Sequence, residues 1–232
     1  MKSGKFLTVA LLLPLPAGAV QIVPDYYDTP NGDAGTYTYF DDSYDGLGDK
    51  TNRYGYLSGG SGDLTDGVIA TQPWPVEEGP GGGKAYVGWI DADPVPVFHF
   101  ADPAVIDSIV IHQDDADGVG GVDHIPRVGM SAWRDGTVVF DQEYFFSDPA
   151  GTGPTAITLD TSAMPDVDRI ALRMNRLRDG RDHWVFVSEI QFFQADAIPS
   201  PASFGLLGLG ALTAAGLRRR GPRSRSRPRS RV

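Results

Sequence analysis

The residues that could do chemistry in this chain are mostly carboxylates. The sequence has no cysteine and only four histidines, against 30 aspartates and glutamates. Segment 113–118 (QDDADG) has part of the spacing of a calcium-binding loop, because Asp115 and Asp117 stand at ligand positions and Gly118 can form the turn. His124 stands where such a loop needs a bidentate glutamate, which excludes an EF-hand. Two interpretations stay open: a loop that binds a cation weakly, and a solvated loop between strands.

The motifs of common enzyme classes are missing. The glycine run at 79–85 lacks the serine or threonine of a phosphate-binding loop, because Ala85 stands at that position. The chain contains no Gly-x-Ser-x-Gly motif and no His-Glu-x-x-His motif, and the lack of cysteine excludes a thiol nucleophile. Two carboxylates could form a glycosidase pair, which a sequence cannot locate. We therefore predict that the protein is not an enzyme, with a glycoside hydrolase as the least favoured alternative.

Two segments carry side chains suited to sugar binding. Trp74 lies between Pro73 and Pro75, where its ring could present a flat face to a sugar; the alternative is that it pins its loop to the domain. The second segment is a polar turn with donors and acceptors for hydroxyl groups. Its candidate ligand residues are Arg178, Asp182 and His183. The alternative for this segment is a solvated hairpin turn.

Strands must position these residues, because no stretch between 21 and 197 keeps the 3.6-residue periodicity of a helix. Short runs rich in β-formers alternate instead with clusters of glycine, proline and aspartate. We predict nine strands, at 36–40, 86–90, 95–100, 106–112, 127–133, 137–141, 155–159, 169–174 and 184–193. This spacing is typical of a β-sandwich or jelly roll. The glycine-rich segment 43–80 is predicted to be the loosest part.

Two of the predicted strands show which residues face the core. In the run 169–174, every second residue is apolar, which predicts one buried face made of Ile170, Leu172 and Met174. In the run 184–193, strict alternation would place Phe186 on the same face as Ile190 and Phe192. The same alternation would place Val185, Val187 and Glu189 together on the opposite face.

Charge is strongly segregated along the chain. Residues 21–197 hold all 30 acidic residues and ten of the 20 basic ones, so this part has a net charge of −20. A domain with this charge is a poor binder of nucleic acid or of an anionic membrane surface, and we predict no nucleic-acid partner. The charge suits binding of calcium or of neutral sugars.

The first 19 residues have the pattern of a secretory signal peptide. Lys2 and Lys5 form a basic start, 6–13 is an apolar core, and 17–19 (Ala-Gly-Ala) fits a cleavage site. The alternative is an uncleaved anchor helix. The pattern predicts a mature domain outside the cytoplasm.

The end of the chain has three features in order: a Pro-x-Pro motif, an apolar run at 202–217 and an arginine cluster. The residues of the motif and of the cluster are Pro199, Ser200, Pro201, Arg218, Arg219 and Arg220. This order resembles the PEP-CTERM sorting signal of Gram-negative bacteria, with Ser200 in place of the usual glutamate. The resemblance implies a transmembrane helix at 202–217, processing by an exosortase and delivery to the cell surface or extracellular matrix. A plain membrane anchor is the alternative.

Five segments between 55 and 195 occur in a characteristic order: 63–68 (DLTDGV), 86–89 (YVGW), 97–100 (VFHF), 105–112 (VIDSIVIH) and 184–192 (WVFVSEIQF). This order resembles the discoidin-like, galactose-binding-type domain, and the resemblance implies a jelly-roll β-sandwich. It also implies a structural calcium ion held by Asp66 and Glu189. The alternative is that Asp66 caps its own turn and Glu189 pairs with an arginine such as Arg173.

The sequence therefore predicts three parts: a signal peptide at 1–19, an all-β sandwich at 20–197 and a sorting signal at 198–232. The predicted function is non-catalytic binding of a carbohydrate or exopolysaccharide at the surface of a Gram-negative bacterium. The alternative is a structural protein of the biofilm matrix that depends on calcium and has no discrete sugar site. Exosortase and, before processing, the inner membrane are the other expected partners.

Overall fold

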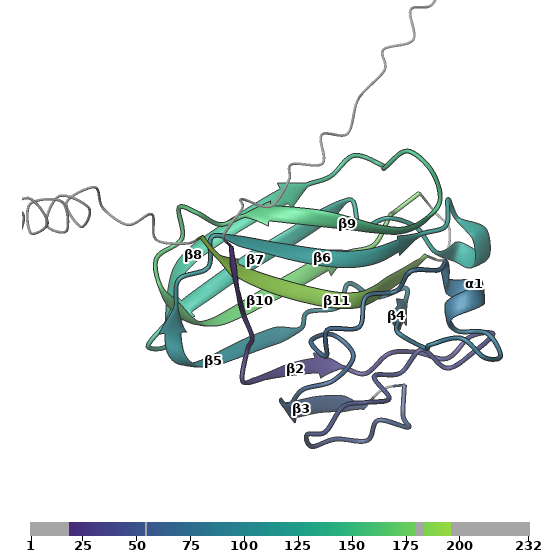
Figure 1. Ribbon diagram of the computed structural model, residues 1–232, viewed down its shortest axis with the longest axis horizontal. Helices are drawn as coiled ribbons and strands as arrows, with labels where there is room; N and C mark the ends of the chain where they lie inside the picture. Colours follow the sequence, from purple (N-terminus) through teal and green to yellow (C-terminus); the bar gives the residue numbers. More distant parts are fainter. Residues whose placement is uncertain (1–18, 54, 180–182, 196–232) are drawn as a thin grey trace, which may run out of the picture. The chain divides into compact units, whose positions relative to one another are not determined.

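The computed structural model describes residues 19–53, 55–179 and 183–195, which form two antiparallel β-sheets packed face to face (Figure 1). In sheet A the order is β1-β11-β6-β9, and β4 pairs with β11 on the same edge as β1. The strands of sheet A are β1 (Val20–Ile22), β4 (Val87–Ile90), β6 (Ser108–Asp115), β9 (Gly153–Asp160) and β11 (Trp184–Gln194). The predicted all-β sandwich is confirmed.

Sheet B has six strands in the order β3-β2-β5-β10-β7-β8. They are β2 (Tyr26–Pro30), β3 (Tyr56–Gly60), β5 (Val97–Ala104), β7 (Arg127–Arg134), β8 (Thr137–Phe145) and β10 (Val167–Asn175). One helical turn, α1 (Trp74–Glu77), and a short 3₁₀ turn, η1 (Val119–Gly121), lie in the connections. No helix in the described ranges is long and apolar enough to cross a membrane.

The main core fills the space between the two sheets. Every strand except β1 and β8 contributes fully buried apolar side chains to it, as the alternation of strand residues requires. On β10, Ile170, Leu172 and Met174 are buried, whereas Arg169 and Arg173 point away from the core. The predicted face of this strand is confirmed.

A second apolar cluster, here called the loop-end cluster, covers the opposite face of β11 at one end of sheet A. Its buried members are Tyr39, Ala70, Trp74, Ala85, Tyr86, Ala116, Val122, Trp184 and Phe186. Most of them come from loops, so the cluster attaches these loops to the sheet. Gly88 of β4 allows this packing, because a Cβ atom there would lie 2.0 Å from the ring of Phe186.

The predicted faces of the last strand are wrong because β11 contains a β-bulge between Val187 and Glu189. Val187 lies in the main core together with Ile190 and Phe192, whereas Phe186 lies in the loop-end cluster. The extra residue, Ser188, reverses the alternation halfway along the strand. One strand therefore contributes side chains to two separate apolar clusters.

Eight of the nine predicted strands are present, but the one predicted at 36–40 is wrong. This segment forms a turn closed by an isolated bridge between Ala34 and Thr38, and Tyr39 packs into the loop-end cluster. Strands β1, β2 and β3 were not predicted. Each has five residues or fewer, and proline and glycine interrupt or border them, so they lack the length of alternation that identifies a strand.

The segment 43–80 is more ordered than its glycine content indicates. It contains β3 and α1, and it packs against a buried carboxylate at Asp41. The hydroxyl of Tyr27 donates a hydrogen bond to Asp41 Oδ2, and the N–H of Asp63 donates to Asp41 Oδ1 at 2.9 Å. The hydroxyl of Tyr44 donates to the carbonyl of Tyr27 at 2.6 Å. These bonds attach the loop to β2.

Candidate functional site

Trp74 begins α1 and is buried at the centre of the loop-end cluster. Its side chain is only 8% exposed, and its ring lies edge-on to the rings of Tyr37, Tyr39 and Phe186. Its Nε1–H donates to the carbonyl of Val119 at 3.2 Å. This placement fits the interpretation in which the tryptophan pins its loop to the domain, because neighbouring rings cover its faces.

The polar turn predicted as a binding segment is described only in part. Asp182 lies outside the described residues. The guanidinium of Arg178 is exposed and pairs with Asp93. His183 is buried, with Nε2 2.7 Å from Asp179 Oδ1 and Nδ1 3.5 Å from Asp123 Oδ2. The structure therefore directs His183 inward and leaves Arg178 at the surface.

The two residues of the predicted calcium pair meet at one turn. Glu189 is buried on β11 and accepts the N–H of Gly67 at 3.1 Å, so the Asp-Gly turn lies directly over it. Asp66 Oδ1 accepts the N–H of Val68 at 2.8 Å, so one oxygen of Asp66 caps its own turn. Burial raises the pKa of Glu189 to about 8, and the nearby charge of Asp66 adds to this rise.

A third oxygen atom at this turn fits a calcium ion. Thr65 Oγ1 is buried and has no hydrogen-bond partner. Among the described residues, no ion pair joins Glu189 to Arg173 or to any other arginine, so the alternative partner for this carboxylate is not found. A buried carboxylate, an orphaned hydroxyl and a turn of exposed carbonyls match the oxygen ligands that calcium prefers.

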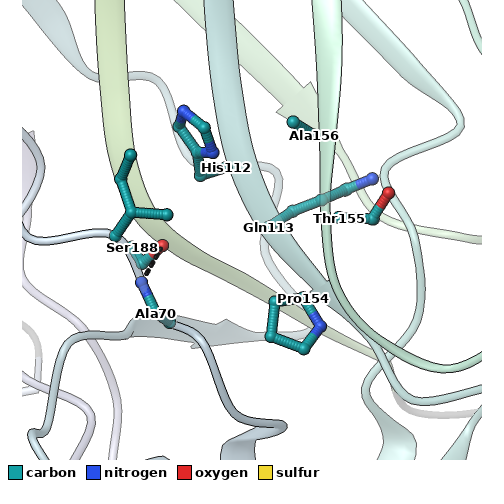
Figure 2. A pocket seen from close by; sticks show the side chains of 8 residues that line it. Ala70, His112, Gln113, Pro154, Thr155, Ala156 and Ser188 are labelled. Atoms are coloured by element: carbon teal, nitrogen blue, oxygen red, sulfur yellow. Dashed lines mark hydrogen bonds between the residues drawn. The ribbon is translucent and has the colours of Figure 1, made fainter. Parts of the chain in front are cut away.

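A small hollow lies on the outer face of sheet A, beneath the loop that carries Ala70 (Figure 2). Its volume is about 260 Å³. The hollow is lined by Ile69, Ala70, His112, Gln113, Pro154, Thr155, Ala156 and Ser188. Ser188 Oγ accepts the N–H of Ala70, and His112 Nε2 lies 3.1 Å from Gln191 Oε1, so these polar groups already have partners. Gln113 Nε2 is buried without a hydrogen-bond partner, so beyond this amide the hollow offers little to a polar ligand.

A different arrangement occupies the outer face of sheet B. Tyr26, His99, Arg169 and Trp133 are direct cross-strand neighbours on β2, β5, β10 and β7. Each of the four projects from the sheet face opposite to the main core, and none of them is buried. We call these four residues the cross-strand row.

The side chains of the cross-strand row hold one another in position. The rings of Tyr26 and His99 are stacked, with centroids 4.3 Å apart, and His99 Nε2 lies 3.0 Å from Asp28 Oδ2. The guanidinium carbon of Arg169 lies 4.4 Å from the centroid of the Trp133 ring, which is cation–π geometry. Arg169 Nε is buried and has no hydrogen-bond partner.

A hollow of about 290 Å³ adjoins one end of this row. Its lining residues are Asp25, Tyr26, His99, Phe100, Ala101, Gly136, Asp168 and Arg169. Asp25 accepts the N–H of Ala101 and Asp168 accepts the N–H of Asp135, so each carboxylate is fixed by the backbone and keeps further lone pairs. The site combines aromatic rings, a guanidinium donor and two carboxylate acceptors.

Sequence reasoning missed the cross-strand row. The alternation in 169–174 puts Arg169 on the face opposite to Ile170, but its neighbours on that face depend on the pairing of strands distant in sequence. Tyr26 lies in a strand that was not predicted. The available signal was the aromatic or cationic residue at an outward position in each of three predicted strands, namely His99, Trp133 and Arg169.

The chain resembles known proteins only in a comparison with solved structures. No protein-family model matches the chain, and no curated protein matches it. One similar solved structure is the family 32 carbohydrate-binding module of C. perfringens NanJ in complex with galactose. It is 13% identical over 55% of this chain and 90% of that chain, with a TM-score of 0.33.

Two similar structures come from Bacteroides fragilis. An F5/8 type C domain is 12% identical over 48% of this chain and 75% of that chain, with a TM-score of 0.35. The C-terminal domain of a chitobiase is 14% identical over 77% of this chain and 100% of that chain, with a TM-score of 0.40.

Proposed function

We propose that this protein is a non-catalytic carbohydrate-binding module and that the cross-strand row, with the adjoining hollow, is its sugar-binding site. The observation that carries this proposal is the continuous row of a phenol, an imidazole, a guanidinium and an indole across four adjacent strands. Binding at such a surface uses packing and hydrogen bonds and needs no reacting nucleophile.

The chemistry of the site matches the two kinds of surface that a sugar offers. Its C–H groups pack on aromatic faces, and its hydroxyls both donate and accept hydrogen bonds. Tyr26, 36% exposed, and Trp133 supply the rings, and Arg169 supplies donors. Asp25 and Asp168 supply acceptors at the edge of the hollow. The excess of carboxylates in this part of the chain favours a neutral sugar over an anionic one.

We also propose a structural calcium ion at the turn over β11. Asp66, Glu189 and Thr65 Oγ1 would hold it, with backbone carbonyls of the turn completing the shell. The support is the buried carboxylate of Glu189 and the orphaned hydroxyl of Thr65. The ion would fasten this turn to the last strand in a chain that has no cysteine for a disulfide.

The proposed cellular location rests on the two ends of the sequence alone. The segments 1–18 and 196–232 lie outside the described residues, and so do the Pro-x-Pro motif and the arginine cluster. The signal-peptide pattern and the PEP-CTERM-like order support export through the inner membrane, processing by an exosortase-type enzyme and display at the surface of a Gram-negative bacterium.

A glycan panel tests the proposed function. The full chain, in calcium buffer, would be titrated against neutral mono- and oligosaccharides, galactose among them, and against acidic bacterial polysaccharides. We expect saturable binding to one class of neutral sugar and no release of reducing ends. Calcium-dependent self-association without saturable binding to any glycan would overturn the proposal and support the matrix protein instead.

A further inference from the structure

Four carboxylates and a histidine meet at the end of β6, away from both sites described above. Asp115, Asp123 and His124 each place one ligand atom within 4.8 Å of the others, and Asp115, Asp117 and Asp148 do the same. We call these five residues the Asp115 cluster. They come from the end of β6 and the turn after it, from the segment before β7 and from the connection between β8 and β9.

Asp115 is the centre of this cluster and is not satisfied by the protein. It is 1% exposed, and its Oδ2 is buried without a hydrogen-bond partner. Its Oδ1 accepts the N–H of Asp117, at 3.3 Å. In the described part of the chain, the basic groups within ion-pair distance of the cluster's carboxylates are histidine nitrogens alone. A buried carboxylate among other carboxylates costs free energy unless a cation joins it.

An independent residue, His183, points into the cluster from the start of β11. Its side chain is 2% exposed, and Nε2 lies 2.7 Å from Asp179 Oδ1. Its Nδ1 is buried without a hydrogen-bond partner and lies 3.5 Å from Asp123 Oδ2. A neutral ring that donates Nε2–H to Asp179 presents the lone pair of Nδ1 to a carboxylate oxygen, and two acceptors do not attract each other.

A metal ion resolves this arrangement. Histidine ligands commonly donate the second ring N–H to a carboxylate, which fixes the tautomer and points the other nitrogen at the metal. His183 has half of this arrangement: its Nε2 faces the carboxylate of Asp179, and its Nδ1 is directed toward Asp123. The other oxygen of Asp123, Oδ1, lies 3.3 Å from His124 Nδ1. The same nitrogen lies 3.8 Å from Asp148 Oδ1. The two imidazoles therefore flank the carboxylate of Asp123, and His124 also shares the group of Asp115.

We propose that the Asp115 cluster and His183 form a binding site for a divalent transition metal, with Asp115, Asp123, His124 and His183 as ligands. The imidazole nitrogens decide the class of ion, because zinc, cobalt and nickel accept mixed nitrogen and oxygen ligands, whereas calcium takes oxygen ligands. The bound ion would join the end of β6, the segment before β7 and the start of β11. It would thereby stiffen the loop whose Val119 carbonyl binds Trp74.

The test is metal titration of the full chain after removal of metals with a chelator. Zinc chloride would be titrated by calorimetry, and cobalt would report nitrogen ligands through its visible absorption. The variants are His124→Gln, His183→Gln and Asp115→Asn, and the control is His112→Gln, a histidine on β6 outside the cluster. We expect one zinc ion per wild-type chain. Each of the three variants should weaken binding about tenfold or more, and the control should not.

Asp115→Asn gives a second readout that a purely structural role would not produce. Without metal, the variant should melt at a higher temperature than wild type, because a charge has been removed from an unpaired cluster. With zinc, the order should reverse. Failure of zinc to bind, or equal binding by wild type and the three variants, would overturn the proposal.

Discussion

Tyr26 and His99 stack face to face across β2 and β5, with 12° between their ring planes. The two residues are direct cross-strand partners, and Asp28 holds His99 from the same face of the sheet. A ligand that packs against Tyr26 therefore meets a ring whose orientation is set before binding. Little side-chain freedom remains to be lost, which favours affinity.

Removal of either aromatic ring of the cross-strand row should weaken sugar binding. We expect Tyr26→Ala and Trp133→Ala to lower affinity by about tenfold or more in calorimetric titration, because buried aromatic contacts dominate such interfaces. Phe145→Ala is the matched control, since this aromatic on β8 is 74% exposed and lies outside the row. If Arg178→Ala abolished binding while Trp133→Ala kept it, the site would lie at the polar turn instead.

Replacement of Trp74 should act on stability. Trp74→Ala removes the ring at the centre of the loop-end cluster, and we expect the free energy of unfolding to fall by about 3–5 kcal/mol in urea titration. Phe145→Ala should change it by less than about 0.5 kcal/mol, because its ring is exposed. If Trp74→Ala lost sugar binding but little stability, Trp74 would be a sugar-binding residue and not a structural one.

The buried carboxylate Asp41 should make stability depend on pH. Burial raises its pKa to about 7, so between about pH 4 and 7 the folded state keeps a proton that the unfolded state releases. This contribution is complete below the unfolded pKa and is lost as the pH rises toward 7. We expect the melting temperature of Asp41→Asn to fall less over this interval than that of wild type. Asp102→Asn, at an exposed position of β5, should follow wild type.

Calcium should stabilise the wild-type chain through the turn over β11. Saturating calcium, at about 100 times the dissociation constant, would add about 2.7 kcal/mol to the free energy of unfolding. Glu189→Gln should abolish this gain, because the buried carboxylate is the main anionic ligand. Glu143→Gln, an exposed glutamate of β8, is the control. Equal calcium gains in wild type and Glu189→Gln would place the ion elsewhere.

The sequence predicted those features that depend on neighbouring residues. The alternation of Ile170, Leu172 and Met174 identified a strand and its buried face. The bulge at Ser188 was not predictable, because nothing in the local pattern shows that one residue is added relative to the partner strand. The proximity of His183 to Asp123 and of Asp148 to His124 is a property of the fold, which joins three connections at the end of one sheet.

The bulge in β11 determines which deletions this strand can tolerate. Because Ser188 is the extra residue, loss of its codon would leave a regularly alternating strand in which Val187, Ile190 and Phe192 still face the core. Loss of a codon beyond the bulge, such as that of Gln191, would instead turn Phe192 outward. Insertions in the connection between β8 and β9, which lies at the surface, carry no such penalty. Within β11, the bulge is therefore the place where the strand can lose a residue and keep its buried face.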